Sequence, residues 1–376
     1  MSHNTVKSLD VPEHVRQTLE TYGFDADAFW RLRRELQAGD FPTQRNQVQG
    51  EVSPPSESAL SPLPEPGSAE AAEDEQRGRQ AISESRVAVA ILNGGMATRF
   101  GGQVKGIVEV LDGDTFLALK LREVARAPGP VPVFLMNSFA TDAPTRAHLE
   151  QNRFFELHEE QLTTVNQHVS IRLTPDGEIF RDSRGDVSLY APGHGDLLDV
   201  LASSASFRDF AARGGRYVLV SNVDNLAATL NPRVIGAHIR AQKPVTVEVA
   251  HRAPNDKGGA PAVYRGKLQV LEGFRFPPDF DISQVPVFNT NTFIFNTEAV
   301  RSDYPLTWFR ADKTVDQRRA VQFERLLGEV TAFTDAHYLW VPRHGPEGRF
   351  LPVKTPDDLI SIRPAIRELF GLHPTR

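Results

Sequence analysis

Short apolar stretches recur along most of the chain, each bounded by turn residues and separated by segments of helical spacing. They are rich in β-branched and aromatic residues, as strands are, and occupy residues 86–92, 131–138, 216–224, 245–250 and 288–296. Between them, the stretches 115–127 and 197–214 carry the apolar spacing of helices. This alternation predicts an α/β fold with a Rossmann-like mixed, mostly parallel sheet flanked by helices. Ligands of such sheets bind beyond the carboxyl ends of the strands.

The first part of the chain departs from this pattern. Residues 10–38 combine helix-start signals with amphipathic spacing and predict two short helices, so we expect an N-terminal helical segment over 1–40. The stretch that follows is rich in Pro, Ser and Glu and shows no periodicity. Because it can bury little apolar surface to offset its ordering entropy, we expect a flexible linker over 41–82, or a loosely held wrap around the rest of the chain. The main α/β domain is expected over 83–376.

Composition narrows the classes of function. The chain has 376 residues, 40% of them hydrophobic and 24% charged, which is typical of a globular protein. It contains no cysteine, which excludes disulfides, thiolate nucleophiles and cysteine-ligated metal centres. A net charge of −6 argues against nonspecific binding to nucleic acid or to anionic membranes. No stretch has the length and apolarity of a signal peptide or a membrane span, so we expect a cytoplasmic protein.

A glycine-rich segment, residues 92–106, follows the first apolar stretch. Its glycines suit a tight turn that needs positive φ, a dinucleotide-binding loop, or a nucleotidyltransferase loop whose backbone N–H groups wrap a triphosphate. The dinucleotide pattern G-x-G-x-x-G does not fit the spacing of Gly94, Gly95 and Gly101. A Walker A loop is excluded because no hydroxyl residue follows Lys105. The turn and the nucleotidyltransferase loop remain as alternatives from the segment alone.

The segment NGGMATRFGGQVKG (93–106) resembles the signature loop of nucleotide-sugar pyrophosphorylases, with Ala97 at a usual glycine and Val104 at a usual proline. Further segments then match the UTP–glucose-1-phosphate uridylyltransferase (UDP-glucose pyrophosphorylase) family in its own order. They are 135–150, 165–178, 190–204 with PGHGD, 217–230 with SNVDNL, 256–273, 288–296 and 348–362 with RFLPVK. By this ordered set the chain is identified as a member of that family, which implies a nucleotide-diphospho-sugar transferase, GT-A-like fold.

The resemblance implies a nucleotidyltransferase that makes a UDP-sugar and pyrophosphate from UTP and a sugar 1-phosphate, with glucose 1-phosphate as the expected acceptor. A sugar phosphate is already mostly dianionic at pH 7, so the reaction needs no general base but needs the repulsion between anions to be cancelled. The implied catalytic cations are Lys354 at the α-phosphate and sugar phosphate, Lys105 at the triphosphate and Arg99 at the leaving pyrophosphate. Arg99 could also be a solvated loop arginine.

Mg²⁺ is the expected cofactor. Asp224 follows a predicted strand and is the expected ligand, because Mg²⁺ in nucleotide sites takes one or two carboxylates together with phosphate oxygens and water. The alternative role for Asp224 is to cap the helix that follows the strand. Asp196, in PGHGD, is expected to be structural and to cap the helix after it.

The remaining family positions bind the substrates. The implied nucleotide-binding residues, with Gln167 bonding the uracil amide edge, are Leu92, Asn93, Gly94, Gly95, Thr98, Lys105, Gln167 and Gly193. The implied sugar-phosphate-binding residues are His194, Asn222, Gly259, Glu272 and Asn291. Glucose-specific relatives usually carry Asn-Thr-Asn-Asn where this chain has NTNT, so Thr292 leaves the sugar open.

Relatives with a long C-terminal β-helical domain use it to assemble. We expect the short form of the family, without that domain, and a monomer or a small homo-oligomer. One alternative function is a UTP-dependent pyrophosphorylase for N-acetylglucosamine 1-phosphate or galactose 1-phosphate. Another is a catalytically weak nucleotide-sugar-binding regulator, which Ala97 and Val104 would motivate because they reshape the glycine-rich loop.

Overall fold

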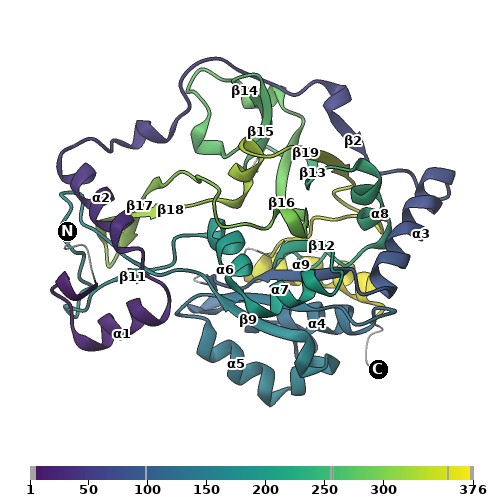
Figure 1. Ribbon diagram of the computed structural model, residues 1–376, viewed down its shortest axis with the longest axis horizontal. Helices are drawn as coiled ribbons and strands as arrows, with labels where there is room; N and C mark the ends of the chain where they lie inside the picture. Colours follow the sequence, from purple (N-terminus) through teal and green to yellow (C-terminus); the bar gives the residue numbers. More distant parts are fainter. Residues whose placement is uncertain (1–5, 98–99, 255, 257, 354, 373–376) are drawn as a thin grey trace.

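The computed structural model describes residues 6–97, 100–254, 256, 258–353 and 355–372 and is built on an eight-stranded sheet (Figure 1). Neighbouring strands are parallel, except where β16 pairs with β12 and β13. The strand order is β2 (Leu60–Pro62), β19 (Ala336–Val341), β13 (Val245–His251), β16 (Val287–Asn296), β12 (Tyr217–Asn222), β3 (Val87–Leu92), β8 (Val133–Asn137) and β9 (Leu162–Asn166). The expected mixed, mostly parallel sheet is confirmed, and each of the five apolar stretches forms one of its strands.

Helices cover both faces of the sheet. Side chains of β3 alternate between two cores, so that Val89 packs in one with α4, α8 and α9 and Ala90 in the other with α6 and α7. All six residues of β3 are buried, which is why the strand is apolar throughout rather than alternating. The helices are α4 (Phe116–Ala125), α5 (Asp142–Gln151), α6 (Leu197–Ser203), α7 (Ala205–Ala212), α8 (Pro232–Ala241) and α9 (Pro356–Phe370).

The two helices expected over 10–38 are present as α1 (Glu13–Thr21) and α2 (Ala26–Gln37). Asp25 caps α2 by accepting a hydrogen bond from the Ala28 N–H. Both helices lie beside β11 (Leu189–Tyr190) and the β17 (Phe309–Val315)–β18 (Arg318–Glu324) hairpin (Figure 1). A third apolar core joins them to these strands and to β10 (Ser170–Ile171), which pairs with β11. The N-terminal helices therefore pack on the rest of the chain rather than standing apart.

The segment 41–82 differs from the expected flexible linker. It contains β1 (Val52–Ser53), which pairs with β14 (Ala260–Tyr264), and β2, which extends the main sheet beside β19. It then enters α3 (Ala69–Ser83), which packs closely against α8. Backbone pairing with distant strands and close helix contact order this segment, and neither requires a periodic apolar pattern. The division of the chain into domains stays a prediction.

Shorter elements complete the fold. A sheet of three strands is formed by β1, β14 and β15 (Lys267–Leu271). The glycine-rich loop holds the pair β4 (Met96–Ala97) and β5 (Gln103–Val104), and β6 (Glu109–Leu111) and β7 (Asp114–Thr115) follow it. In the part of the chain that the structure describes, no helix combines the length and the apolarity that a bilayer crossing would require.

Candidate functional site

A cavity of about 370 Å³ lies beyond the carboxyl ends of β3, β8 and β12. From β3 the chain continues to β8 and β9 on one side, whereas β12 lies on the other, so this is the reversal of strand order at which open α/β sheets bind ligands. Its lining residues are Leu92, Gly94, Gly95, Lys105, Met136, Gln167, Ala191, Gly193, His194, Asn222, Val223 and Asp224. Except for Met136, Ala191 and Val223, all of them are expected site residues.

The glycine-rich loop forms one wall of this cavity, and Gly94 lies against the Gln167 amide. A Cβ atom at Gly94 would be 2.0 Å from Gln167 Oε1, so a side chain at position 94 would displace the amide. The Gly94 carbonyl is fixed by the Ser138 hydroxyl, which donates a hydrogen bond to it over 2.9 Å. Nothing lies within 4 Å of the position that a Cβ atom would take at Gly95. The backbone is thus bare on the cavity side, as a nucleotide-binding loop requires.

Asn93 does not take the place expected for it. Its side chain is fully buried, and its Nδ2 donates hydrogen bonds to Asn137 Oδ1 over 2.8 Å and to Thr145 Oγ1 over 3.0 Å. Because the side chain is fully buried and its Nδ2 is bonded beneath the loop, the structure gives Asn93 a supporting role and no side-chain surface on the cavity.

Lys105 and Asp224 form an ion pair across the cavity between the glycine-rich loop and the end of β12. The helix-cap alternative for Asp224 is wrong, because the next helix, α8, begins at Pro232 and is capped by Asn231. Among the described residues, no three His, Asp or Glu side chains gather closely enough to cage a metal ion. A single carboxylate suits Mg²⁺ that takes its other oxygens from phosphates and water, and Asp224 would exchange its pairing with Lys105 for that ion when the phosphates bind.

His194 faces the cavity from the PGHGD segment, in the turn His194–Asp196. Its Nδ1 accepts a hydrogen bond from the Leu327 N–H over 3.0 Å. Desolvation by burial lowers the pKa of His194 to about 4, so the ring is neutral at pH 7. With Nδ1 accepting, the proton of the neutral ring sits on Nε2, which makes that atom the donor.

Of the expected sugar-binding residues, His194 and Asn222 line the cavity, and Asn291 contacts Asn222. Asn291 Nδ2 donates a hydrogen bond to Oδ1 of the cavity residue Asn222 over 2.9 Å. Asn291 has φ +59°, in β16 where the pairing with β13 shifts register, and this bulge sets its direction. Gly259 and Glu272 do not line the cavity, although the two are in contact, because the Gly259 N–H bonds the Glu272 carboxylate. Burial raises the pKa of Glu272 to about 7, an effect that Arg275 partly opposes.

The segment RFLPVK is anchored beside Asp224. Arg349 is buried and donates to the Glu248 carboxylate over 2.6 and 3.1 Å. Asn225 donates to the Arg349 carbonyl over 3.1 Å, accepts from the Leu351 N–H over 2.9 Å and forms a bridge with Pro352. The chain just before Lys354 is therefore tied to the residue just after Asp224. Lys354, Thr98 and Arg99 themselves lie outside the described residues.

Sequence reasoning missed Arg325. Its main chain bonds both sides of the PGHGD segment, because the Arg325 N–H donates to the Pro192 carbonyl over 2.7 Å and the Arg325 carbonyl accepts from the Gly195 N–H over 3.0 Å. Its guanidinium donates to Asp196 over 2.5 and 3.1 Å. Asp196 stands at the N-cap position of α6 as expected, but its side chain makes no capping hydrogen bond and pairs with Arg325 instead. The sequence carries no local signal for this pair, because the two residues are 129 positions apart and the burial of Asp196 is visible only in the structure.

Comparisons with known proteins agree with this geometry. The sequence model of a family described as UTP–glucose-1-phosphate uridylyltransferase matches residues 40–370. The UTP–glucose-1-phosphate uridylyltransferase of Saccharomyces cerevisiae is 31% identical over an alignment of 303 positions, and the match covers 74% of this chain and 59% of the yeast protein. The chain spans about three fifths of the length of the curated relatives it matches.

Solved structures share the fold. A UDP-glucose phosphorylase from Trypanosoma brucei superposes with a TM-score of 0.74 at 25% identity, covering 92% of this chain and 77% of that one. A uridine diphosphate N-acetylglucosamine pyrophosphorylase from the same organism gives a TM-score of 0.77 at 20% identity, covering 93% and 79%. The same architecture thus occurs in proteins named for two different sugars.

Proposed function

We propose that this chain, which belongs to the UTP–glucose-1-phosphate uridylyltransferase family, transfers a uridylyl group from UTP to glucose 1-phosphate. The products would be UDP-glucose and pyrophosphate. The observation that carries the proposal is the cavity beyond β3 and β12, where bare glycine backbone, the Gln167 amide, Lys105 and Asp224 meet. The glycine backbone and the Gln167 amide suit a nucleotide base, Lys105 suits phosphates, and Asp224 suits a divalent ion.

The nucleotide would bind along the glycine-rich loop. Gln167 has both a donor and an acceptor for the amide edge of uracil, and Leu92, Gly94 and Gly95 leave the backbone open to the base. Gly193, which also lines the cavity, has φ +109°, and a Cβ atom there would lie 2.6 Å from the Arg325 carbonyl oxygen. Both the backbone conformation and the lack of space therefore require glycine at this position. In the glycine-rich loop, Thr98 is proposed to bind the nucleotide and Arg99 the leaving pyrophosphate.

In the reaction, an oxygen of the sugar phosphate attacks the α-phosphorus of UTP, and the bond from that phosphorus to the bridging oxygen of pyrophosphate breaks. No proton has to be removed, because the attacking phosphate is mostly dianionic at pH 7. Lys105 and Lys354 would offset the charge on the phosphates, and neutral His194 would donate Nε2–H to the sugar phosphate. Asp224 would hold Mg²⁺, which when bound neutralises phosphate charge and aligns the reacting groups.

A second acceptor follows from one observation. This chain carries Thr292 where glucose-specific relatives usually have asparagine, and an N-acetylglucosamine pyrophosphorylase has the same fold. N-acetylglucosamine 1-phosphate or galactose 1-phosphate would then replace glucose 1-phosphate in the same mechanism. A regulator that binds nucleotide sugars with little turnover is the remaining alternative, and neither nucleic acid nor membrane is proposed as a partner.

The test is pyrophosphate release from UTP and Mg²⁺ with each of the three sugar 1-phosphates. We expect turnover with glucose 1-phosphate, and kcat about 10²–10³-fold lower in Lys105→Ala, Asp224→Asn and Lys354→Ala, by analogy with the loss of one preorganised donor. Lys243→Ala, at an exposed ion pair with Asp335, is the control and should keep parental turnover. Equal turnover in Lys354→Ala would remove the mechanism, and no release with any acceptor would remove the function.

A further inference from the structure

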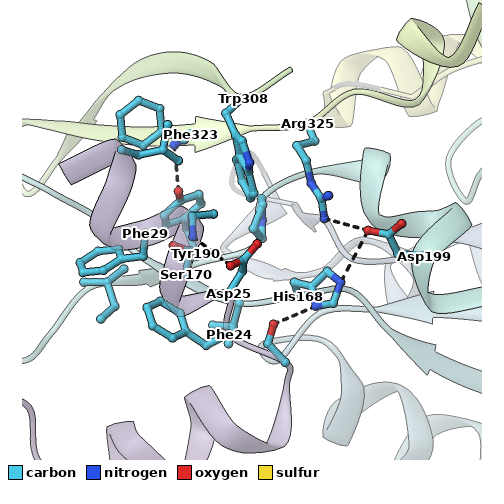
Figure 2. A pocket seen from close by; sticks show the side chains of 16 residues that line it. Phe24, Asp25, Phe29, His168, Ser170, Tyr190, Asp199, Trp308, Phe323 and Arg325 are labelled. Carbon is cyan, nitrogen blue, oxygen red and sulfur yellow. Dashed lines mark hydrogen bonds and ion pairs between the residues drawn. The ribbon is translucent and has the colours of Figure 1, made fainter. Parts of the chain in front are cut away.

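A second cavity, of about 320 Å³, lies between the N-terminal helices and the strands β10, β11 and β18 (Figure 2). It shares a wall with the nucleotide cavity. His168 and Pro192 line the second cavity, while their neighbours in sequence, Gln167 and Gly193, line the first. A shift of His168 or Pro192 in the second cavity would therefore act directly on the neighbouring residue that is proposed to bind the nucleotide.

His168 is held at this wall by hydrogen bonds at both its side chain and its main chain. Its ring Nδ1–H donates to the Gly23 carbonyl over 2.8 Å, and its backbone N–H donates to Asp196 Oδ2 over 3.0 Å. Its Nε2 lies 4.0 Å from Asp199 (Figure 2). Because the ring borders a cavity, packing restrains it on only part of its surface, and these polar contacts set its position.

The N-terminal side of the contact is built for this ring. Gly23 has φ +68°, and a Cβ atom there would lie 2.8 Å from His168 Nδ1. Glycine therefore permits both the turn between α1 and α2 and the approach of the imidazole. The partner of the backbone N–H is equally fixed, since Asp196 is fully buried and also accepts from Arg325.

We propose that His168 is a positioning residue for the nucleotide. By joining Gly23 of the N-terminal helical segment to Asp196, it fixes the main chain at 167–168 and with it the orientation of the Gln167 amide. This inference rests on the proposed role of Gln167 in binding uracil. The N-terminal helices line a different cavity, but through His168 they would influence the affinity of the nucleotide site for UTP.

The test is calorimetric binding of UTP, without turnover, to the full chain. His168→Ala removes the ring contact and keeps the backbone N–H. We expect the Kd for UTP to rise about three- to tenfold, because a misdirected Gln167 amide loses one hydrogen bond to the uracil. His168→Asn carries an amide N–H at the same distance along the side chain as Nδ1, and it should restore parental affinity. In kinetics, KM for UTP should rise while kcat and KM for the sugar phosphate stay within twofold.

Arg33→Ala is the matched control. Arg33 also joins an N-terminal helix, α2, to the rest of the chain. It donates to the Gly177 carbonyl over 2.8 Å and to the Glu178 carboxylate over 2.8 Å, and it has no hydrogen bond to residues 167–168. It should lower the Tm as His168→Ala does but leave the Kd for UTP within twofold. A parental Kd in His168→Ala, or an equal loss of affinity in Arg33→Ala, would overturn the inference. UTP binding without pyrophosphate release in the parent chain would contradict the proposed reaction alone, whereas absence of UTP binding would contradict both.

Discussion

At the scale of single residues, the nucleotide cavity depends on the missing side chain of Gly94. A methyl group there would overlap Gln167 Oε1, whereas one at Gly95 would enter open space. We expect Gly94→Ala to lower the free energy of unfolding by about 1 kcal/mol, the low end of overpacking costs, because the end of the Gln167 side chain must shift beside an open cavity. Gly95→Ala should stay within about 0.5 kcal/mol, as substitutions at open positions do. Urea unfolding of the two variants measures this difference. Equal stability would mean that the Gln167 amide moves aside freely.

At the scale of elements, the sequence predicts what depends on a continuous local pattern. Strands such as β3 are buried on both faces, so their apolar runs are visible without knowing their neighbours. Likewise, Lys105, Asp224 and His194 stand in ordered motifs, and the structure brings them to one cavity. The role of Arg325 could not be predicted, because the β17–β18 hairpin brings it to PGHGD from a distant part of the chain. Pairing partners of this kind leave no mark in local periodicity.

The packing of helix α3 against α8 is another long-range contact that the local sequence pattern does not reveal, and it can be tested. A Cβ atom at Gly78 would lie 1.8 Å from the Pro232 carbonyl oxygen, and one at Gly236 would lie 1.8 Å from that of Asp74. We expect Gly78→Ala to lower the free energy of unfolding by about 3 kcal/mol, because two helix backbones must separate. The control is Glu75→Ala on the same helix, which removes an exposed ion pair with Arg79 and should cost less than about 0.5 kcal/mol. Guanidinium unfolding midpoints of the two variants measure this difference. Parental stability in Gly78→Ala would show that α3 is only loosely packed against α8.

At the scale of the whole molecule, stability should depend on pH through groups whose charged forms the fold disfavours. Burial lowers the pKa of His194, His238 and His337 to about 4, from an ordinary value of 6.5. Burial also raises the pKa of Glu272 to about 7, from an ordinary value of 4.5. The two effects have opposite signs. The histidines stabilise the fold fully above pH 6.5 and lose this contribution as the pH falls towards 4. The glutamate destabilises the fold above pH 7 and ceases to do so as the pH falls towards 4.5.

Each of these four displacements is worth about 3–4 kcal/mol. Burial also raises the pKa of Glu123 and Asp199 and lowers the pKa of His148, so four histidines stand against three carboxylates and the histidines prevail. We therefore expect the urea midpoint to fall steadily between pH 6.5 and pH 4.5. His238 bonds Thr246 over 2.7 Å and Asn296 over 2.9 Å, away from the proposed substrates, so His238→Gln should flatten this slope without entering the site. Glu272→Gln should steepen it, because the opposing contribution is removed. A midpoint that stays level or rises on acidification would show that these histidines are protonated in the folded state at little cost in stability.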